Sequence, residues 1–260
     1  MFRKAFIEKC GDGTLRHEEA LVAPVLRARG VEIELYTQKL IDRRALPLSD
    51  DTFVMGSMDA MHGAMKQLGI DIPQPDDYPI ALQPYLRRRV WRATLREIEA
   101  RVWSETPVPV FAKPADRRKS FTGRVFHHHD DLYYLGSASR RQAVLCSDVV
   151  QWLSEYRAYV VDDRIVAINH YAGDAGRHVD ADVVRSAIDA YRASGSAPCA
   201  YGIDFGVLAS GETALIEAND GYALGAYDID AENYADLLLA RWRELLQQKR
   251  PPDPMTIRHA

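Results

Sequence analysis

The sequence predicts an α/β layer in the first third of the chain, followed by an α+β region. In the first third, short apolar strands alternate with helices, an order that is typical of a parallel sheet. In the remainder, strands follow one another through tight turns such as Asp162-Asp163 and Ser210-Gly211, which is typical of antiparallel hairpins. We therefore expect two regions that are built on different kinds of sheet.

The first third should contain three strands and two helices. The strands are expected at residues 2–8, 31–36 and 51–55, and the helices at residues 17–29 and 57–69. Gly30 can end the first helix and Ser57 can cap the second, because these residue types satisfy free backbone groups at helix ends. The following stretch, residues 70–84, holds four prolines and is the best candidate for a linker.

After the linker, the segment 85–101 is rich in arginine and carries apolar residues near helical spacing. This pattern predicts an amphipathic helix with a solvated basic face, and a surface for an anionic ligand is the alternative. His127, His128 and His129 are consecutive, and adjacent strand residues point to opposite faces, so we expect a polar loop rather than a metal site. The remaining elements are expected as strands at residues 108–113, 125–126, 132–135, 143–147, 155–161 and 164–170, a hairpin at 202–219, and helices at 180–193 and 231–248.

The composition of the chain argues against several classes of protein. The chain has 260 residues and a net charge of −4, which is not the charge of a general nucleic-acid binder. Its three cysteines, Cys10, Cys146 and Cys199, have no paired spacing, which suggests reduced thiols. No apolar run approaches the roughly 18 residues of a membrane span. We therefore expect a cytoplasmic protein with neither a membrane nor a nucleic acid among its partners.

The hairpin at residues 202–219 carries the strongest functional signal. A two-residue turn at Ser210-Gly211 would place Asp204 directly opposite Glu217, and Gly202 opposite Asn219. Because side chains alternate between the faces of a strand, Asp204, Glu217 and Asn219 would then share one face. The opposite face would carry the apolar residues of both strands, including Ile203, Phe205, Ile216 and Ala218, and would pack on the core.

Two carboxylates that face each other across a pair of strands repel and destabilise the sheet. A shared proton, a nearby lysine or arginine, or a bound cation would offset the repulsion. Two carboxylates and an amide oxygen form an all-oxygen set that suits Mg²⁺, which is usually completed by water and substrate phosphates. The hairpin therefore predicts a magnesium and nucleotide site, with a solvent-exposed polar face as the alternative.

The pattern D-x12-E-x-N at Asp204, Glu217 and Asn219 resembles the metal-binding signature of the ATP-grasp superfamily. The segments YGIDFGVL and IEANDGYALGAY are similar to the clade of that superfamily named for one arginine and two lysines. The resemblance covers residues 108–227 and implies an ATP-grasp fold, α+β with an N-terminal α/β domain. The implied domains are residues 1–84 and 85–260, the second divided into a lysine and lid subdomain at about 85–148 and a metal-binding subdomain at about 149–250.

The same resemblance implies ATP and Mg²⁺ as cofactors, with Mn²⁺ as a substitute for magnesium. Lys113 and Lys119 would bind the phosphates of the nucleotide, with Lys119 also acting in catalysis from the loop at residues 114–123. An ordinary solvated lysine at the end of a strand is the alternative for Lys113. The remaining nucleotide contacts would come from the hinge residues Gln151, Trp152 and Leu153 and, for the ribose, from Glu155.

One position departs from the family pattern. Several ATP-grasp ligases carry an arginine two residues before the first metal carboxylate, and here that residue is Gly202. Charge on the transferred phosphoryl group still needs a cation, and Arg157 is the candidate catalytic residue. An ion pair of Arg157 with Glu155 or Asp204 is the alternative, and it is compatible with that role.

The acceptor substrate is expected beside the metal residues, because Asp220, Gly221 and Tyr222 follow them directly. His170 would also contact substrate if the Asp162-Asp163 turn places it opposite Glu155. The implied function is an ATP-dependent ligase that joins a small-molecule or peptide carboxylate to an amine or another nucleophile through an acyl phosphate, releasing ADP. A phosphotransferase on a small molecule and a non-catalytic ATP-binding module remain the alternatives, and homodimerisation is a habit of the family.

Overall fold

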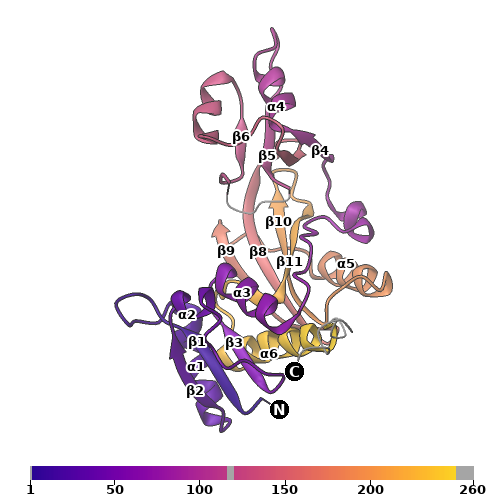
Figure 1. The fold of residues 1–260 in the computed structure, drawn as a ribbon. Coiled ribbons are helices and arrows are strands. Elements are labelled where there is room, and N and C mark those ends of the chain that lie inside the picture. The colour runs from indigo at the N-terminus through magenta and orange to yellow at the C-terminus, as the bar shows by residue number, and fades with distance from the viewer. Residues whose placement is uncertain (1, 116–119, 250–260) are drawn as a thin grey trace.

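The computed structural model describes residues 2–115 and 120–249, and it contains three sheets. Figure 1 shows them one after another along the molecule, with the third sheet lying between the first and the second. The first sheet is formed by the N-terminal third of the chain. The other two are formed by the remainder and lie against each other at the candidate site.

The first sheet is parallel, with strand order β2-β1-β3. Every predicted element of this region is present within two residues of its expected bounds. Ser57 caps the third helix by accepting from the Ala60 N–H group, and Gly69 ends it in the left-handed conformation. The elements are β1 (Lys4–Glu8), α1 (His17–Ala28), β2 (Glu32–Tyr36), α2 (Gln38–Asp42), β3 (Thr52–Met55) and α3 (Met58–Leu68).

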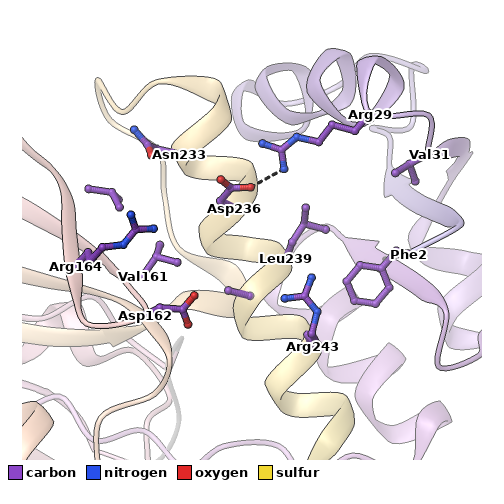
Figure 2. A pocket seen from close by; sticks show the side chains of 12 residues that line it. Phe2, Arg29, Val31, Val161, Asp162, Arg164, Asn233, Asp236, Leu239 and Arg243 are labelled. Carbon is purple, nitrogen blue, oxygen red and sulfur yellow. Dashed lines mark hydrogen bonds and ion pairs between the residues drawn. The ribbon is translucent and has the colours of Figure 1, made fainter.

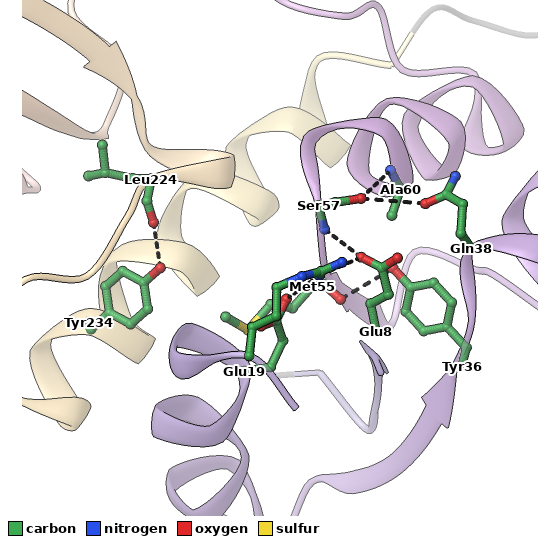
Figure 3. A network of polar contacts seen from close by, with 10 residues as sticks. Glu8, Glu19, Tyr36, Gln38, Met55, Ser57, Ala60, Leu224 and Tyr234 are labelled. Atoms are coloured by element: carbon green, nitrogen blue, oxygen red, sulfur yellow. Dashed lines mark hydrogen bonds and ion pairs between the residues drawn. The ribbon is translucent and has the colours of Figure 1, made fainter. Parts of the chain in front are cut away.

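A buried polar network lies at the carboxyl ends of β1 and β3 (Figure 3). Glu8 accepts a hydrogen bond from the Ser57 N–H group at 2.7 Å and another from the Arg16 guanidinium at 2.9 Å. The Tyr36 hydroxyl donates to the Met55 carbonyl at 3.2 Å. Glu19 contacts Arg16 at 3.3 Å, but its Oε2 atom is buried without a hydrogen-bond partner.

The second sheet is antiparallel, with strand order β4-β7-β5-β6. One face packs on α4 through an apolar cluster that includes Leu95, Val110 and Phe126. The opposite face looks toward the third sheet. The elements are β4 (Val90–Thr94), α4 (Leu95–Val102), β5 (Val110–Pro114), β6 (Arg124–Phe126) and β7 (Ala143–Ser147).

Two predictions for this region are wrong. The segment 85–101 is not one helix, because Arg87 has a positive φ of 51° and residues 90–94 pair with β7. Helix α4 starts only after Thr94, whose side chain accepts from the Glu97 N–H group while Glu97 reaches back to the Thr94 N–H group. The expected strand at residues 132–135 belongs to a 3-10 helix, His129–Leu135.

The third sheet is antiparallel, with strand order β11-β10-β8-β9. Its strands β8 and β9 are joined by the predicted turn at Asp162-Asp163, where both residues have positive φ. One face of the sheet packs on α5, and the other face carries the candidate site. The elements are β8 (Trp152–Val161), β9 (Arg164–Gly173), α5 (Ala181–Ala193), β10 (Ala200–Leu208), β11 (Thr213–Asp220) and α6 (Ala231–Gln247).

Helix α6 joins the first sheet to the third, as Figure 1 shows at the lower end of the molecule. Trp242 on α6 is fully buried and donates to the Thr52 carbonyl at the start of β3 at 2.9 Å. Tyr234 donates to the Leu224 carbonyl at 2.5 Å, which ties the helix to the loop after β11 (Figure 3). Among the described residues, no helix has both the length and the apolar character to cross a membrane, and all three cysteines are free thiols.

Candidate active site

The β10–β11 hairpin places Asp204 opposite Glu217 and Gly202 opposite Asn219, as predicted. The predicted turn, however, is one residue too short. Leu208 donates to the Glu212 carbonyl at 2.9 Å, so the loop has three residues and Gly211 adopts a φ of 88°. A β-bulge between Leu215 and Glu217 adds one unpaired residue, Ile216, and this offsets the longer loop.

The bulge also changes which residues of β11 face the core. Leu215 is fully buried and packs with Phe205 in the cluster beneath α5. Ile216 was expected in that core, but it lines a pocket beside Glu217 instead. The predicted pairing of the carboxylates is therefore confirmed, and the predicted core position of Ile216 is wrong.

Asp204, Glu217 and Asn219 meet on one face of the hairpin, which we call the metal face. The Asn219 amide nitrogen lies 3.1 Å from Glu217 Oε1 and 3.5 Å from Asp204 Oδ2. The Asn219 amide nitrogen is thus within reach of both carboxylates. Rotation of the amide by half a turn would present its oxygen at the same place, so the donor set fits a hard divalent cation.

Two glycines flank Asp204 on the metal face and leave room for neighbouring side chains. A Cβ atom at Gly206 would lie 2.4 Å from the Trp152 ring, and one at Gly202 would lie 2.7 Å from Leu224 and 3.3 Å from Arg157 Cδ. Any residue larger than glycine would therefore displace these groups. At Gly202, where several family members carry an arginine, the space is taken by Leu224 and by the side chain of Arg157.

Arg157 stands directly opposite Asp204 on the neighbouring strand. Its guanidinium donates to both Asp204 oxygens, at 2.7 and 2.8 Å, and to the Gly225 carbonyl at 3.3 Å. It lies over the Tyr227 ring at 4.9 Å and is buried. Of the two ion pairs that the sequence left open, the structure contains the pair with Asp204.

Lys113, at the end of β5, reaches across from the second sheet to the metal face. Its ammonium lies 2.5 Å from Glu217 Oε2 and 2.8 Å from Asp77 Oδ2, and 4.6 Å from the centre of the Tyr78 ring. Burial favours the neutral amine, but Glu217 and Asp77 outweigh it and raise the pKa of Lys113. Burial likewise opposes ionisation of Glu217, yet Lys113 lowers its pKa, so both groups stay charged.

A pocket of about 100 Å³ opens between the second and third sheets beside this lysine. Its walls are mainly apolar and aromatic, which suits the flat ring of a base. Of the three predicted hinge residues, Trp152 lines it, whereas the Gln151 carbonyl accepts from Ala209 and the Leu153 carbonyl accepts from Asp174. The lining residues are Tyr78, Arg88, Phe111, Lys113, Ser147, Asp148, Val149, Val150, Trp152, Ile216 and Glu217.

Arg88 is a site residue that the sequence did not single out within its basic segment. Its guanidinium lies 5.2 Å from the Trp152 ring and donates to the carbonyls of Leu215 and Ile216, at 2.6 and 3.0 Å. Burial lowers its pKa, although arginine stays protonated at neutral pH. Asp77 and Tyr78 were also missed, because their contacts join parts of the chain that lie far apart in sequence.

The predicted ribose ligand Glu155 accepts a hydrogen bond from the Tyr171 hydroxyl at 2.9 Å. Tyr171 stacks on Tyr227 with ring centres 4.6 Å apart, and the pair covers the metal face next to Arg157. His170 does not lie opposite Glu155, because a bulge in β9 pairs it with Tyr156 instead. It therefore lies on the other face of the sheet, against the Tyr156 ring.

The loop after β11 is held by contacts on both sides. Both Asp220 oxygens accept from Arg241 on α6, at 2.7 and 2.6 Å, so this carboxylate is tied to α6. The Tyr222 hydroxyl lies 2.9 Å from His62 Nε2 on α3, and Gly221 is buried beside it. Lys119, predicted as the second nucleotide lysine, lies outside the described residues.

A separate pocket of about 410 Å³ lies between the first sheet, the β8–β9 turn and α6 (Figure 2). Phe2, Val161 and Leu239 form part of its apolar lining, and Arg164 and Arg243 stand at its edge. None of the residues on the metal face lines this pocket. The candidate site is therefore marked by the convergence of charged groups and not by this pocket.

Comparisons with known proteins agree with this geometry. A family model of the ATP-grasp domain, for family 2 of the clade named for one arginine and two lysines, matches residues 85–237. Among solved structures, D-alanine–D-alanine ligase from Bacillus anthracis is similar with a TM-score of 0.56 at 13% identity, over 96% of this chain and 100% of that one. The same ligase complexed with ATP gives a TM-score of 0.55 at 14% identity, over 95% and 100% of the two chains.

A RimK domain protein of the ATP-grasp type from Sphaerobacter thermophilus gives a TM-score of 0.52 at 16% identity, over 90% of this chain and 99% of that one. No protein with a curated description matches the sequence. At such low identity, these likenesses show a shared fold.

Proposed function

Because the chain belongs to the clade of ATP-grasp proteins named for one arginine and two lysines, we propose that it is an ATP-dependent ligase that joins a carboxylate to an amine or another nucleophile. One observation carries the proposal. Two cations, Lys113 and Arg157, and two carboxylates, Asp204 and Glu217, converge on one buried face beside a pocket that suits a base. This arrangement fits the binding of a polyanionic nucleotide together with a divalent cation.

In this proposal, Asp204, Glu217 and Asn219 hold Mg²⁺, and Mn²⁺ can replace it. When bound, the cation would neutralise phosphate oxygens and draw charge from the transferred phosphoryl group. Each of the two carboxylates also forms an ion pair with a side-chain cation, which matches its charge. The repulsion expected between opposed carboxylates is thereby offset by Arg157 and Lys113.

The remaining residues bind and orient the substrates. Lys113 contacts phosphate oxygens as a point charge, and the family resemblance assigns the same role to Lys119. Arg157 can donate to a phosphoryl oxygen, because its side chain lies on the metal face and its Cδ atom is 3.3 Å from where a Cβ atom at Gly202 would lie. The Tyr171–Tyr227 pair shields this region from water, which strengthens the charge interactions within it.

The proposed reaction has two steps. An oxygen of the substrate carboxylate attacks the γ-phosphorus, so the bond to the β–γ bridging oxygen breaks and ADP leaves with that electron pair. The nitrogen of the amine then attacks the acyl carbon, phosphate leaves, and the nitrogen loses a proton to give an amide. The protein contributes position and charge, without a covalent nucleophile.

The test uses Glu217→Gln and Asn219→Ala, with Glu212→Gln, next to the loop of the same hairpin, as the matched control. Each site variant should lower ADP release by at least about 100-fold, because the divalent cation loses a ligand. Glu212 is exposed and bonds to Ser210, so its variant should keep the wild-type rate. Unchanged ADP release and unchanged Mg-ATP binding in both site variants would refute the metal assignment.

The dependence on substrates tests the type of reaction. A screen of amino acids and short peptides for stimulated ADP release, followed by mass spectrometry of the product, should reveal a requirement for both a carboxylate and an amine. A requirement for a single hydroxyl substrate would indicate a phosphotransferase. Tight binding of ATP without turnover under any substrate pair would indicate a binding module.

A further inference from the structure

In the structure, the linker extends beyond the expected residues 70–84 to residue 89, just before β4, and it does more than connect the first sheet to the second. The Asp77 carbonyl accepts from the Ala218 N–H group at 2.9 Å, so the linker is pinned to the outer edge of β11, one residue from Glu217. Further along, Arg88 donates to the Leu215 and Ile216 carbonyls. The linker therefore holds the strand that carries the metal residues at two points.

Between these two points, the linker places a carboxylate on the candidate phosphate lysine. Asp77 Oδ2 lies 2.8 Å from Lys113 Nζ, and both side chains are nearly buried, with 12% and 13% of their surface exposed. The ammonium thus lies between Asp77 on one side and Glu217 on the other. Tyr78, the next residue of the linker, lies against the same ammonium at 4.6 Å.

We propose that Asp77 is a positioning residue that holds Lys113 in place for the phosphates of ATP while Glu217 turns to the metal. This inference rests on the function proposed above. A buried ammonium that lost Glu217 to a cation would be left without a charged partner, which is costly in a low-dielectric setting. Asp77 remains as that partner, because its backbone is fixed to β11 and does not depend on the nucleotide.

Without Asp77, Lys113 would keep its ion pair with Glu217 and compete with the divalent cation for that carboxylate. Removal of Asp77 should therefore weaken Mg-ATP binding and raise the concentration of Mg²⁺ that binding needs. Simple charge counting predicts tighter binding of Mg-ATP instead, because the loss of a carboxylate near a polyanion removes repulsion. The two explanations thus predict opposite signs for the same substitution.

The experiment compares wild type, Asp77→Asn and Asp77→Glu, with Asp76→Asn as the matched control. For Asp77→Asn we expect the KM for Mg-ATP to rise about tenfold, with kcat within about threefold of wild type, as for an interaction made equally in ground and transition states. Calorimetric titration with ATP at a series of Mg²⁺ concentrations should show the same loss of affinity. Asp77→Glu should recover most of it, because the carboxylate is restored.

Asp76 is an exposed acid in the same linker, so Asp76→Asn should stay within about twofold of wild type. A KM for Asp77→Asn that is unchanged or lower than wild type would overturn the positioning role. So would a failure of Asp77→Glu to recover affinity although the variant melts like wild type. If wild type itself does not bind Mg-ATP, the proposed function fails, and this is distinguishable from a failure at Asp77.

Discussion

Two buried charged clusters in this molecule look alike but are held in different ways. In the N-terminal network, Glu8 accepts from the Ser57 backbone N–H group as well as from Arg16. On the metal face, the hydrogen bonds to Asp204 and Glu217 among the described residues come from the side chains of Arg157, Lys113 and Asn219. One cluster is built into the backbone, and the other is held together by side chains.

This difference indicates what each cluster is for. A backbone N–H group cannot move away without unfolding its segment, so the Glu8 network fixes the ends of β1 and β3. Side chains on opposing strands and sheets can exchange one partner for another, so the proposed divalent cation could take the place of these side chains at the two carboxylates. We therefore expect substitutions in the first cluster to change stability, and substitutions on the metal face to change activity.

The largest effect is expected for Arg157→Lys. Lysine keeps the charge beside Asp204 but loses the two-point contact and the planar fork of donors, so kcat should fall by about 100- to 1,000-fold. The melting temperature should change little by comparison. Steady-state ADP release and thermal melting would measure the two effects.

Arg164→Lys is the matched control, because Arg164 begins the neighbouring strand β9 and is exposed. It should retain the wild-type kcat. If Arg157→Lys lost much stability but little kcat, Arg157 would have a structural role like that of the Glu8 network. The proposed difference between the two clusters would then be wrong.

Glu8→Ala is expected to have a smaller effect, and to lower the stability of the protein rather than its activity. The Ser57 N–H group would lose its acceptor at a buried position, which costs about 2–3 kcal/mol of unfolding free energy. Urea denaturation would measure this loss. Glu34→Ala on the adjacent strand is the control, because Glu34 is exposed and pairs with Lys4 at the surface, so its removal should cost less than about 1 kcal/mol.

The smallest effect is expected for Glu19→Gln. Burial raises the pKa of Glu19, so the folded state holds its proton more tightly than the unfolded state does. Stability should therefore decrease as pH rises from the usual pKa of a glutamate through the raised value. Glutamine has no such charge, so the variant should be more stable than wild type at pH 8, by up to about 1 kcal/mol.

Urea denaturation of both proteins at about pH 4 and pH 8 would measure this difference, which should be smaller at the lower pH. If Glu19→Gln were less stable than wild type at both values, the contact of Glu19 with Arg16 would outweigh the cost of burial. Glu19 would then belong with the groups that hold the network together.

The sequence was sufficient for the elements whose signals are local. The first sheet, the two predicted helices, the cap at Ser57 and the end of the first helix before Gly30 are confirmed, because each depends on residues within one or two turns of the chain. The ATP-grasp fold and the family are also confirmed. The strand β4 was missed because its partner β7 lies about 50 residues away, and local spacing favoured a helix instead.

The site was partly predictable for the same reason. The pairing of Asp204 with Glu217 follows from the hairpin, although the longer loop and the bulge had to offset each other for the prediction to hold. Asp77, Arg88 and Tyr171 carry no local signal, because their roles come from contacts between sheets or from a second bulge. A different bulge in β9, at Val166, is why His170 was misplaced.

The extra residue in β11 has one more consequence. In a regular strand, successive carbonyl groups point in opposite directions, so a single donor cannot reach two neighbours. At the bulge, the Leu215 and Ile216 carbonyls both accept from Arg88, and together they form a small cradle of negative dipoles. These dipoles stabilise the buried guanidinium of Arg88. The wall of the base pocket therefore carries a guanidinium that is held by backbone carbonyl groups, and the Glu217 and Asp148 carboxylates of the same lining also favour its charge.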